Sequence, residues 1–200
     1  MNSCVYKLNE KKSDTLIIAF AGHAILFGGI QRFEFVKFLS THFSHAHNHF
    51  YADQFRDLFH KGICGISHSI DETTEYLKKE IEPYKHVIFL GVSSGGYAAI
   101  LFGSLLNIKA VLAFIPQTIR RNKIVDEKYR DLNIHINNKT KYYIYGDASI
   151  TNEKDFHHIS HCERIAHHPN VFLTRMQSFR LKEMRDNGEL AEILNNLIES

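Results

Sequence analysis

Cysteine is scarce in this sequence. Cys4, Cys64 and Cys162 are scattered over 200 residues. An odd number of widely spaced cysteines does not form a disulfide framework, and free thiols are typical of a reducing compartment. Residues 1–7 also lack the apolar segment of a secretory signal. The sequence therefore predicts a cytoplasmic protein with reduced cysteines.

Long apolar runs and a charge bias are also missing. No stretch approaches the roughly 20 apolar residues of a membrane-spanning helix. The 24 basic and 22 acidic residues leave a formal net charge of +2, which gives no electrostatic reason to bind nucleic acid or another polyanion. A hydrophobic content of 44% is that of a globular chain. We expect one domain over residues 1–200, without a membrane span or a nucleic-acid partner.

Short apolar runs alternate with helical patterns along the whole chain. This alternation predicts an α/β protein with three layers, α/β/α, and a mostly parallel sheet. Strands are expected at residues 15–20, 50–52, 86–90, 110–114, 142–145 and 171–174. Helices are expected at residues 33–39, 71–81, 94–106, 157–166 and 181–198. The polar segment 116–141 between two of these strands predicts a lid or insertion near a site.

The most informative motif is the run Gly-Val-Ser-Ser-Gly-Gly at residues 91–96. It separates a buried strand pattern from a helix of small and apolar residues, so its Gly-x-Ser-x-Gly pattern falls on a strand-to-helix turn. That context predicts a nucleophile elbow, in which a tight turn exposes Ser93 above the edge of the sheet. An ordinary glycine-rich turn is the alternative. A phosphate-binding loop is excluded, because no Gly-Lys-Ser/Thr follows.

A serine nucleophile needs an acid and an oxyanion hole in addition to a base. Asp147 directly follows a predicted strand, at the sheet edge that should also carry Ser93; the alternative is a turn aspartate. The backbone N–H of Ser94, at the start of the next helix, is one candidate oxyanion donor. An N–H from His23 or Ala24, after the first strand, is the other, unless this segment is a plain turn.

The base does not lie where the α/β-hydrolase pattern predicts it. Residues 175–180, after the last strand, contain no histidine. The nearest candidates follow the strand that carries Asp147, and His157 is the first choice, with His158 and His161 behind it. His157 and His161 would share a helix face. Each of these histidines could instead serve in packing or capping.

A second group of histidines lies at positions 42, 45, 47 and 49. Alternation at the last three would place their imidazoles on one face of a strand, which is a possible metal arrangement. Asp53 is the only nearby carboxylate in the sequence. We interpret the group as a solvated histidine-rich edge and expect neither a metal nor another cofactor.

Several segments resemble one known group of proteins. They are 20–22 (Phe-Ala-Gly), 60–63 (His-Lys-Gly-Ile), 91–99 (Gly-Val-Ser-Ser-Gly-Gly-Tyr-Ala-Ala), 145–147 (Tyr-Gly-Asp), 161–164 (His-Cys-Glu-Arg) and 184–190 (Met-Arg-Asp-Asn-Gly-Glu-Leu). Together they resemble a small bacterial and viral α/β-hydrolase-like family, some members of which accompany surface-polysaccharide genes. The resemblance implies a histidine near position 178, where this chain has Ser178. A relocated base or a degenerate enzyme would explain that departure.

These observations predict a serine hydrolase, either an esterase or an acyl-transfer enzyme, that acts on a small-molecule or glycan ester. Ser93 would attack the ester carbonyl, His157 would serve as base and Asp147 would orient it. The alternative is a binding protein that keeps the fold and has lost its base. A metal hydrolase built on the histidine group is a third hypothesis. An imidazole nitrogen within hydrogen-bond reach of the Ser93 hydroxyl favours the enzyme.

Overall fold

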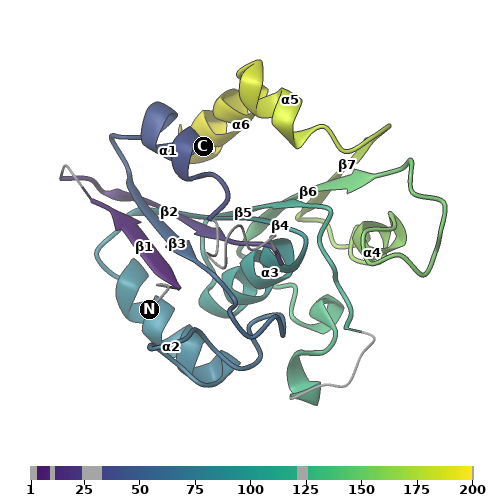
Figure 1. Ribbon diagram of the computed structural model, residues 1–200, viewed down its shortest axis with the longest axis horizontal. Helices are drawn as coiled ribbons and strands as arrows, with labels where there is room; N and C mark the ends of the chain where they lie inside the picture. Colours follow the sequence, from purple (N-terminus) through teal and green to yellow (C-terminus); the bar gives the residue numbers. More distant parts are fainter. Residues whose placement is uncertain (1–3, 10–11, 24–32, 121–125, 200) are drawn as a thin grey trace.

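A seven-stranded sheet forms the centre of the computed structural model, which describes residues 4–9, 12–23, 33–120 and 126–199. The strand order is β1-β3-β2-β4-β5-β6-β7 (Figure 1). The strands are β1 (Val5–Leu8), β2 (Thr15–Phe20), β3 (His47–Tyr51), β4 (His86–Val92), β5 (Ala110–Phe114), β6 (Lys141–Asp147) and β7 (Val171–Met176). Strand β1 pairs antiparallel with β3, and every other pair is parallel.

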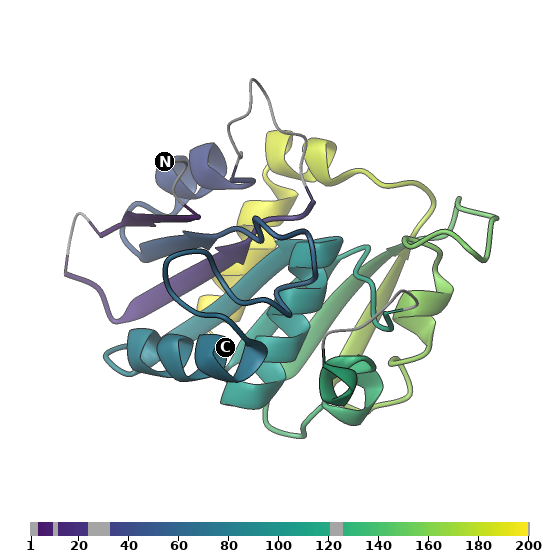
Figure 2. The same ribbon diagram turned by 60° about the horizontal axis from the view of Figure 1, so that its bottom comes forward.

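Helices cover both faces of this sheet. They are α1 (Val36–His42), α2 (Ile70–Ile81), α3 (Ser94–Leu106), α4 (Ser160–Glu163), α5 (Leu181–Asp186) and α6 (Glu189–Glu199), with short 3-10 helices η1 (Glu127–Tyr129) and η2 (Leu132–Ile134). Helices α1, α5 and α6 lie on one face and α2 and α3 on the other, as Figures 1 and 2 show. The predicted three-layer α/β/α architecture is confirmed. Among the described residues, no helix combines the length and apolar character needed to cross a bilayer.

The two central strands β4 and β5 are buried, as their apolar sequences predict. All residues of β5 and all but the first of β4 are buried, because a parallel strand with helices on both faces meets no water. Helix α3 is buried from Ser94 to Ser104. It can approach the sheet closely because Gly103 has no side chain: a Cβ there would lie 2.4 Å from a methyl of Val111.

The differences from the predicted elements lie at the periphery. Strand β1, short and half exposed, has no counterpart among the predicted strands. The helix predicted over residues 181–198 is two helices, because Gly188 adopts φ 89° between α5 and α6. The helix predicted over 157–166 is only the four-residue α4, preceded by turns.

Two glycines allow the backbones of β2, β4 and α3 to touch beside Ser93. A Cβ on Gly95 would lie 2.1 Å from the carbonyl oxygen of Phe20, and one on Gly91 would lie 2.2 Å from the carbonyl carbon of Gly95. Such contacts are with backbone atoms, which cannot rotate aside as a side chain can. The glycine spacing of the motif therefore has a steric basis in the fold.

Gly95→Ala is accordingly expected to destabilise the protein by about 3 kcal/mol or more. Gly65→Ala is the matched comparison. Gly65 has φ 77°, but no neighbouring atom lies within 4 Å of a Cβ placed there. The substitution should therefore lower the free energy of unfolding only through the left-handed backbone, by about 1–2 kcal/mol. Urea denaturation of both variants measures the difference. Equal losses would show that the space at Gly95 is not limiting.

Candidate active site

Ser93 occupies the turn between β4 and α3. It adopts φ 56° and ψ −116°, a conformation that a residue with a Cβ rarely takes. Its N–H donates to the carbonyl of Phe114 at 2.9 Å, and its carbonyl accepts from the N–H of Tyr97 at 3.0 Å. Backbone strain of this kind persists only where the surrounding structure enforces it. The turn holds the serine side chain half-exposed at the carboxyl edge of the sheet.

The side chain of Ser93 meets an imidazole. Ser93 Oγ lies 2.7 Å from Nε2 of His157, which comes from the loop between β6 and α4. The other ring nitrogen, Nδ1, lies 3.7 Å from Oδ1 of Asp155. The same carboxylate oxygen accepts the backbone N–H of His157 at 2.8 Å, which fixes the turn. Hydroxyl and imidazole are thus in hydrogen-bond contact, whereas the carboxylate of Asp155 lies beyond hydrogen-bond distance of the ring.

Asp147, the predicted acid, is buried at the end of β6 and bonded elsewhere. Its Oδ1 accepts the N–H and the hydroxyl of Ser149, at 2.8 and 2.6 Å, and its Oδ2 accepts the N–H of Phe179 at 3.1 Å. Its backbone pairs with His158, so it lies near the base in the chain fold. Within the described part of the chain, the carboxylate in ion-pair range of His157 is Asp155. Asp155 lies only two residues before His157 in the sequence, but its position carries no motif that marks it as an acid.

The other two candidate bases point elsewhere. His158 Nδ1 lies 2.8 Å from the hydroxyl of Ser160, and His161 Nδ1 accepts the N–H of Thr118 at 3.2 Å. Ser178, at the position where the resembling family has its histidine, is exposed and lines a separate surface hollow after β7. Of these residues, His157 is the one that contacts Ser93.

A cavity of about 350 Å³ opens beside the Ser93–His157 pair. Its walls are Gly22, His23, Glu34, Val92, Ser93, Ile115, Gln117, Phe156 and His157. His23, from the segment after β2, therefore shares the cavity with the serine. The N–H of Ser94 opens α3, where no intrahelical acceptor is available. Ala24, the other predicted oxyanion residue, lies outside the described residues.

Glu34 is a wall residue that no sequence pattern indicated. It lies just before α1, and its Oε2 accepts the N–H of Gly22 at 3.3 Å. Burial raises the pKa of the Glu34 carboxyl, an effect that the Gly22 N–H and the charge of Arg185 only partly offset. No motif surrounds Glu34; packing of α1 on the sheet brings it to the cavity.

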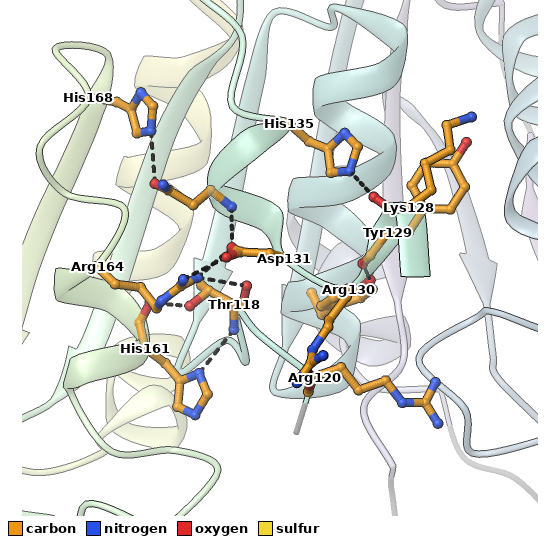
Figure 3. Close-up of polar contacts among 12 residues, drawn as sticks. Thr118, Arg120, Lys128, Tyr129, Arg130, Asp131, His135, His161, Arg164 and His168 are labelled. Atoms are coloured by element: carbon orange, nitrogen blue, oxygen red, sulfur yellow. Dashed lines mark hydrogen bonds and ion pairs between the residues drawn. The ribbon is translucent and has the colours of Figure 1, made fainter. Parts of the chain in front are cut away.

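The described part of segment 116–141 packs against α4. Arg164 donates from its two terminal nitrogens to both carboxylate oxygens of Asp131, at 2.6 and 2.8 Å, and from Nη1 to the carbonyl of Thr118 at 3.2 Å. Figure 3 shows this fork beside the contact of Thr118 with His161. Residues 121–125 of the predicted lid lie outside the described residues. The bidentate pair anchors the polar segment to the helix that follows His157.

The histidine group at 42–49 has other partners. His47 Nδ1 lies 2.7 Å from the hydroxyl of Tyr84, and His49 Nε2 lies 3.1 Å from the amide oxygen of Asn9. His49 Nδ1 lies 3.2 Å from Glu80. Over the residues described, no three side chains of the metal-binding types gather into one possible site.

Known proteins resemble this chain in fold but not detectably in sequence. No family profile matches the chain, and neither does any curated protein sequence. The capsule O-acetyltransferase of Neisseria meningitidis serogroup A superimposes with a TM-score of 0.66 at 15% identity, over 98% of this chain and 92% of that one.

Two further solved structures are similar over nearly the full length. A lipase-esterase related protein from Clostridium acetobutylicum has a TM-score of 0.63 at 14% identity, covering 97% of this chain and 98% of that one. Est1E from Butyrivibrio proteoclasticus has a TM-score of 0.57 at 12% identity, covering 98% and 94%. At such identities the likeness concerns the fold alone. With its sheet order and its serine turn, the chain has an α/β-hydrolase-like fold.

Proposed function

We propose that this protein is a serine hydrolase, an esterase or acyl-transfer enzyme that acts on a small-molecule or glycan ester. The observation that carries the proposal is the 2.7 Å contact between Ser93 Oγ and His157 Nε2 at a strained turn. A serine hydroxyl is a weak nucleophile by itself, and an adjacent imidazole activates it by accepting its proton. The cavity beside the pair has room for a small acyl group.

The proposed reaction has two halves. In the first, Ser93 Oγ attacks the ester carbonyl carbon while its proton passes to Nε2 of His157. The negative charge on the carbonyl oxygen is held by the N–H of Ser94 and an N–H of the segment at His23; one such donor contributes about 10²–10³ in rate. The tetrahedral intermediate collapses, the alcohol leaves with the proton from His157, and the acyl group stays on Ser93.

In the second half, His157 takes a proton from an acceptor hydroxyl. The acceptor oxygen attacks the acyl carbon, and Ser93 leaves and regains the proton from His157. Water as acceptor completes an esterase cycle, and an alcohol completes a transfer. Structural neighbours support retaining both hydrolysis and acyl transfer as proposals. They include a lipase-esterase related protein and an O-acetyltransferase that has also been seen in complex with CoA.

Covalent labelling tests the proposal. A fluorophosphonate probe should modify the folded protein at Ser93, located by peptide mass spectrometry, and p-nitrophenyl acetate should be hydrolysed. Acetyl-CoA and a polyol acceptor, tested beside the ester, separate transfer from hydrolysis by the product formed. A folded sample that neither reacts at Ser93 nor cleaves esters or thioesters would leave the binding-protein alternative.

The two aspartates near the base should respond differently to the same substitution. Asp155→Asn should lower kcat/KM about tenfold, well below the roughly 10⁴-fold known for a buried orienting acid, because Asp155 is half exposed and 3.7 Å from Nδ1. Asp147→Asn should instead cost about 1–3 kcal/mol of stability, because an N–H donor loses its acceptor on this buried side chain. Ester kinetics and urea denaturation of both variants measure this. A larger kinetic loss in folded Asp147→Asn would return the acid role to Asp147.

A further inference from the structure

The carboxyl group of Glu34 lies on the side of the cavity where the oxyanion segment begins. Its Oε2 accepts the N–H of Gly22, and both of its oxygens lie 3.6 Å from the place that a Cβ on Gly22 would occupy. The same Cβ position lies 3.1 Å from the carbonyl oxygen of Val92, the residue before Ser93. Glu34 is therefore separated from the nucleophile turn by little more than the Gly22 backbone.

This carboxyl group has more capacity to accept hydrogen bonds than the protein uses. An ionised carboxylate offers about four acceptor positions. Within the described segments, the hydrogen bond to Glu34 is the one from Gly22, and it is long, at 3.3 Å. Arg185 acts on Glu34 only through its charge. A largely buried acid with so few partners favours any ligand that brings a positive charge or a donor.

The charge of Glu34 also bears on the reaction itself. A negative group in the cavity opposes the negative charge that develops on the carbonyl oxygen, and the burial of the Glu34 carboxyl limits the solvent screening of this repulsion. A cationic group on the substrate would reverse the effect, because it would pair with Glu34. The aromatic ring of Phe156, which also lines the cavity, is a further favourable surface for an ammonium group.

We propose that Glu34 makes the site selective for esters that carry an ammonium group close to the ester bond. The inference rests on the proposed function, because it names the substrate class of that same site. Glu34 is here a specificity-determining residue: it pairs with the substrate and takes no part in proton transfer. Anionic esters are correspondingly poor substrates, since their charge would face the same carboxylate.

An isosteric pair of esters tests the inference. Acetylcholine and 3,3-dimethylbutyl acetate have the same shape and differ by one positive charge. The wild type should have a kcat/KM at least about tenfold higher for acetylcholine. E34Q keeps an oxygen for the Gly22 N–H and removes the charge, so the ratio of the two kcat/KM values should fall to about 1. E75Q, an equal charge change on the exposed face of α2, should keep the wild-type ratio.

Protection of Ser93 from a neutral fluorophosphonate gives a second readout, which also serves if E34Q does not fold. Choline should protect the wild type at concentrations at least about tenfold lower than 3,3-dimethylbutan-1-ol. A labelled, active protein that treats the charged and neutral compounds alike overturns the selectivity and leaves the hydrolase proposal standing. A selectivity that persists in E34Q overturns the role of Glu34. A folded protein without labelling or turnover overturns the proposed function, and this inference with it.

Discussion

Replacing Ser93 by alanine should abolish ester cleavage, with a loss in kcat of about 10⁴-fold or more. The oxygen of the Ser93 hydroxyl is the atom that would bond to the acyl carbon, and among the described residues it is the side-chain atom that contacts His157 Nε2. Alanine keeps the strained turn, because only the oxygen is removed, so the fold should persist. The measurements are p-nitrophenyl acetate kinetics and fluorophosphonate labelling, with thermal unfolding as the check on folding.

Ser178→Ala is the matched control for this substitution. Ser178 is exposed and lines a different hollow, so the same chemical change there should alter kcat/KM by less than about twofold. Residual labelling of Ser93→Ala at another serine would locate the nucleophile elsewhere and remove the main support for the proposed mechanism. Equal losses in both variants would point to a general effect on the protein.

Replacing His157 by alanine should lower kcat about 10³-fold or more, because Ser93 then loses the group that accepts its proton and later returns it to the leaving alcohol. The rate of fluorophosphonate labelling should fall with it, since phosphonylation needs the same activated hydroxyl. The loop backbone should remain, because the contact that fixes it uses the main-chain N–H of residue 157.

His158→Ala provides the comparison for the base. The imidazole of His158 contacts Ser160 and does not reach Ser93, so its removal should change kcat less than about threefold. A His157→Ala protein that is labelled at the wild-type rate would contradict the base assignment. It would also direct attention to His23, the other imidazole in the cavity wall.

The serine turn could be predicted from sequence because its causes are local. The glycines at 91 and 95 indicate that the strand and helix backbones approach closely. The structure confirms this, because neither position has room for a Cβ. The apolar runs of the central strands are equally direct, since a strand buried on both faces has no polar side to obscure its pattern. Strand β1, half exposed and at the sheet edge, carries no comparable signal.

The side-chain partners at the site depend on long-range packing and could not be read in the same way. The position of Asp147 at the end of β6 made it a reasonable prediction for the acid that orients the base. The direction of its carboxylate, however, is set by the N–H groups of Ser149 and Phe179. Glu34 and Ser93 are far apart in the sequence, and only the fold brings them to one cavity. Proximity along the chain to β6 was enough to select His157, which the fold brings to Ser93; its role stays a prediction.

The hydrogen bond from the N–H of Phe179 to Asp147 has a consequence for how this molecule can vary. It holds the loop after β7 by its main chain, and a main-chain donor is present in every residue type except proline. If His157 is the base, the side chains of this loop have no part in the reaction. The loop then needs only the main-chain hydrogen bond to Asp147. Residues 177–179 could therefore drift in sequence, or be redesigned to bear a tag or binding motif, while the reacting atoms keep their places.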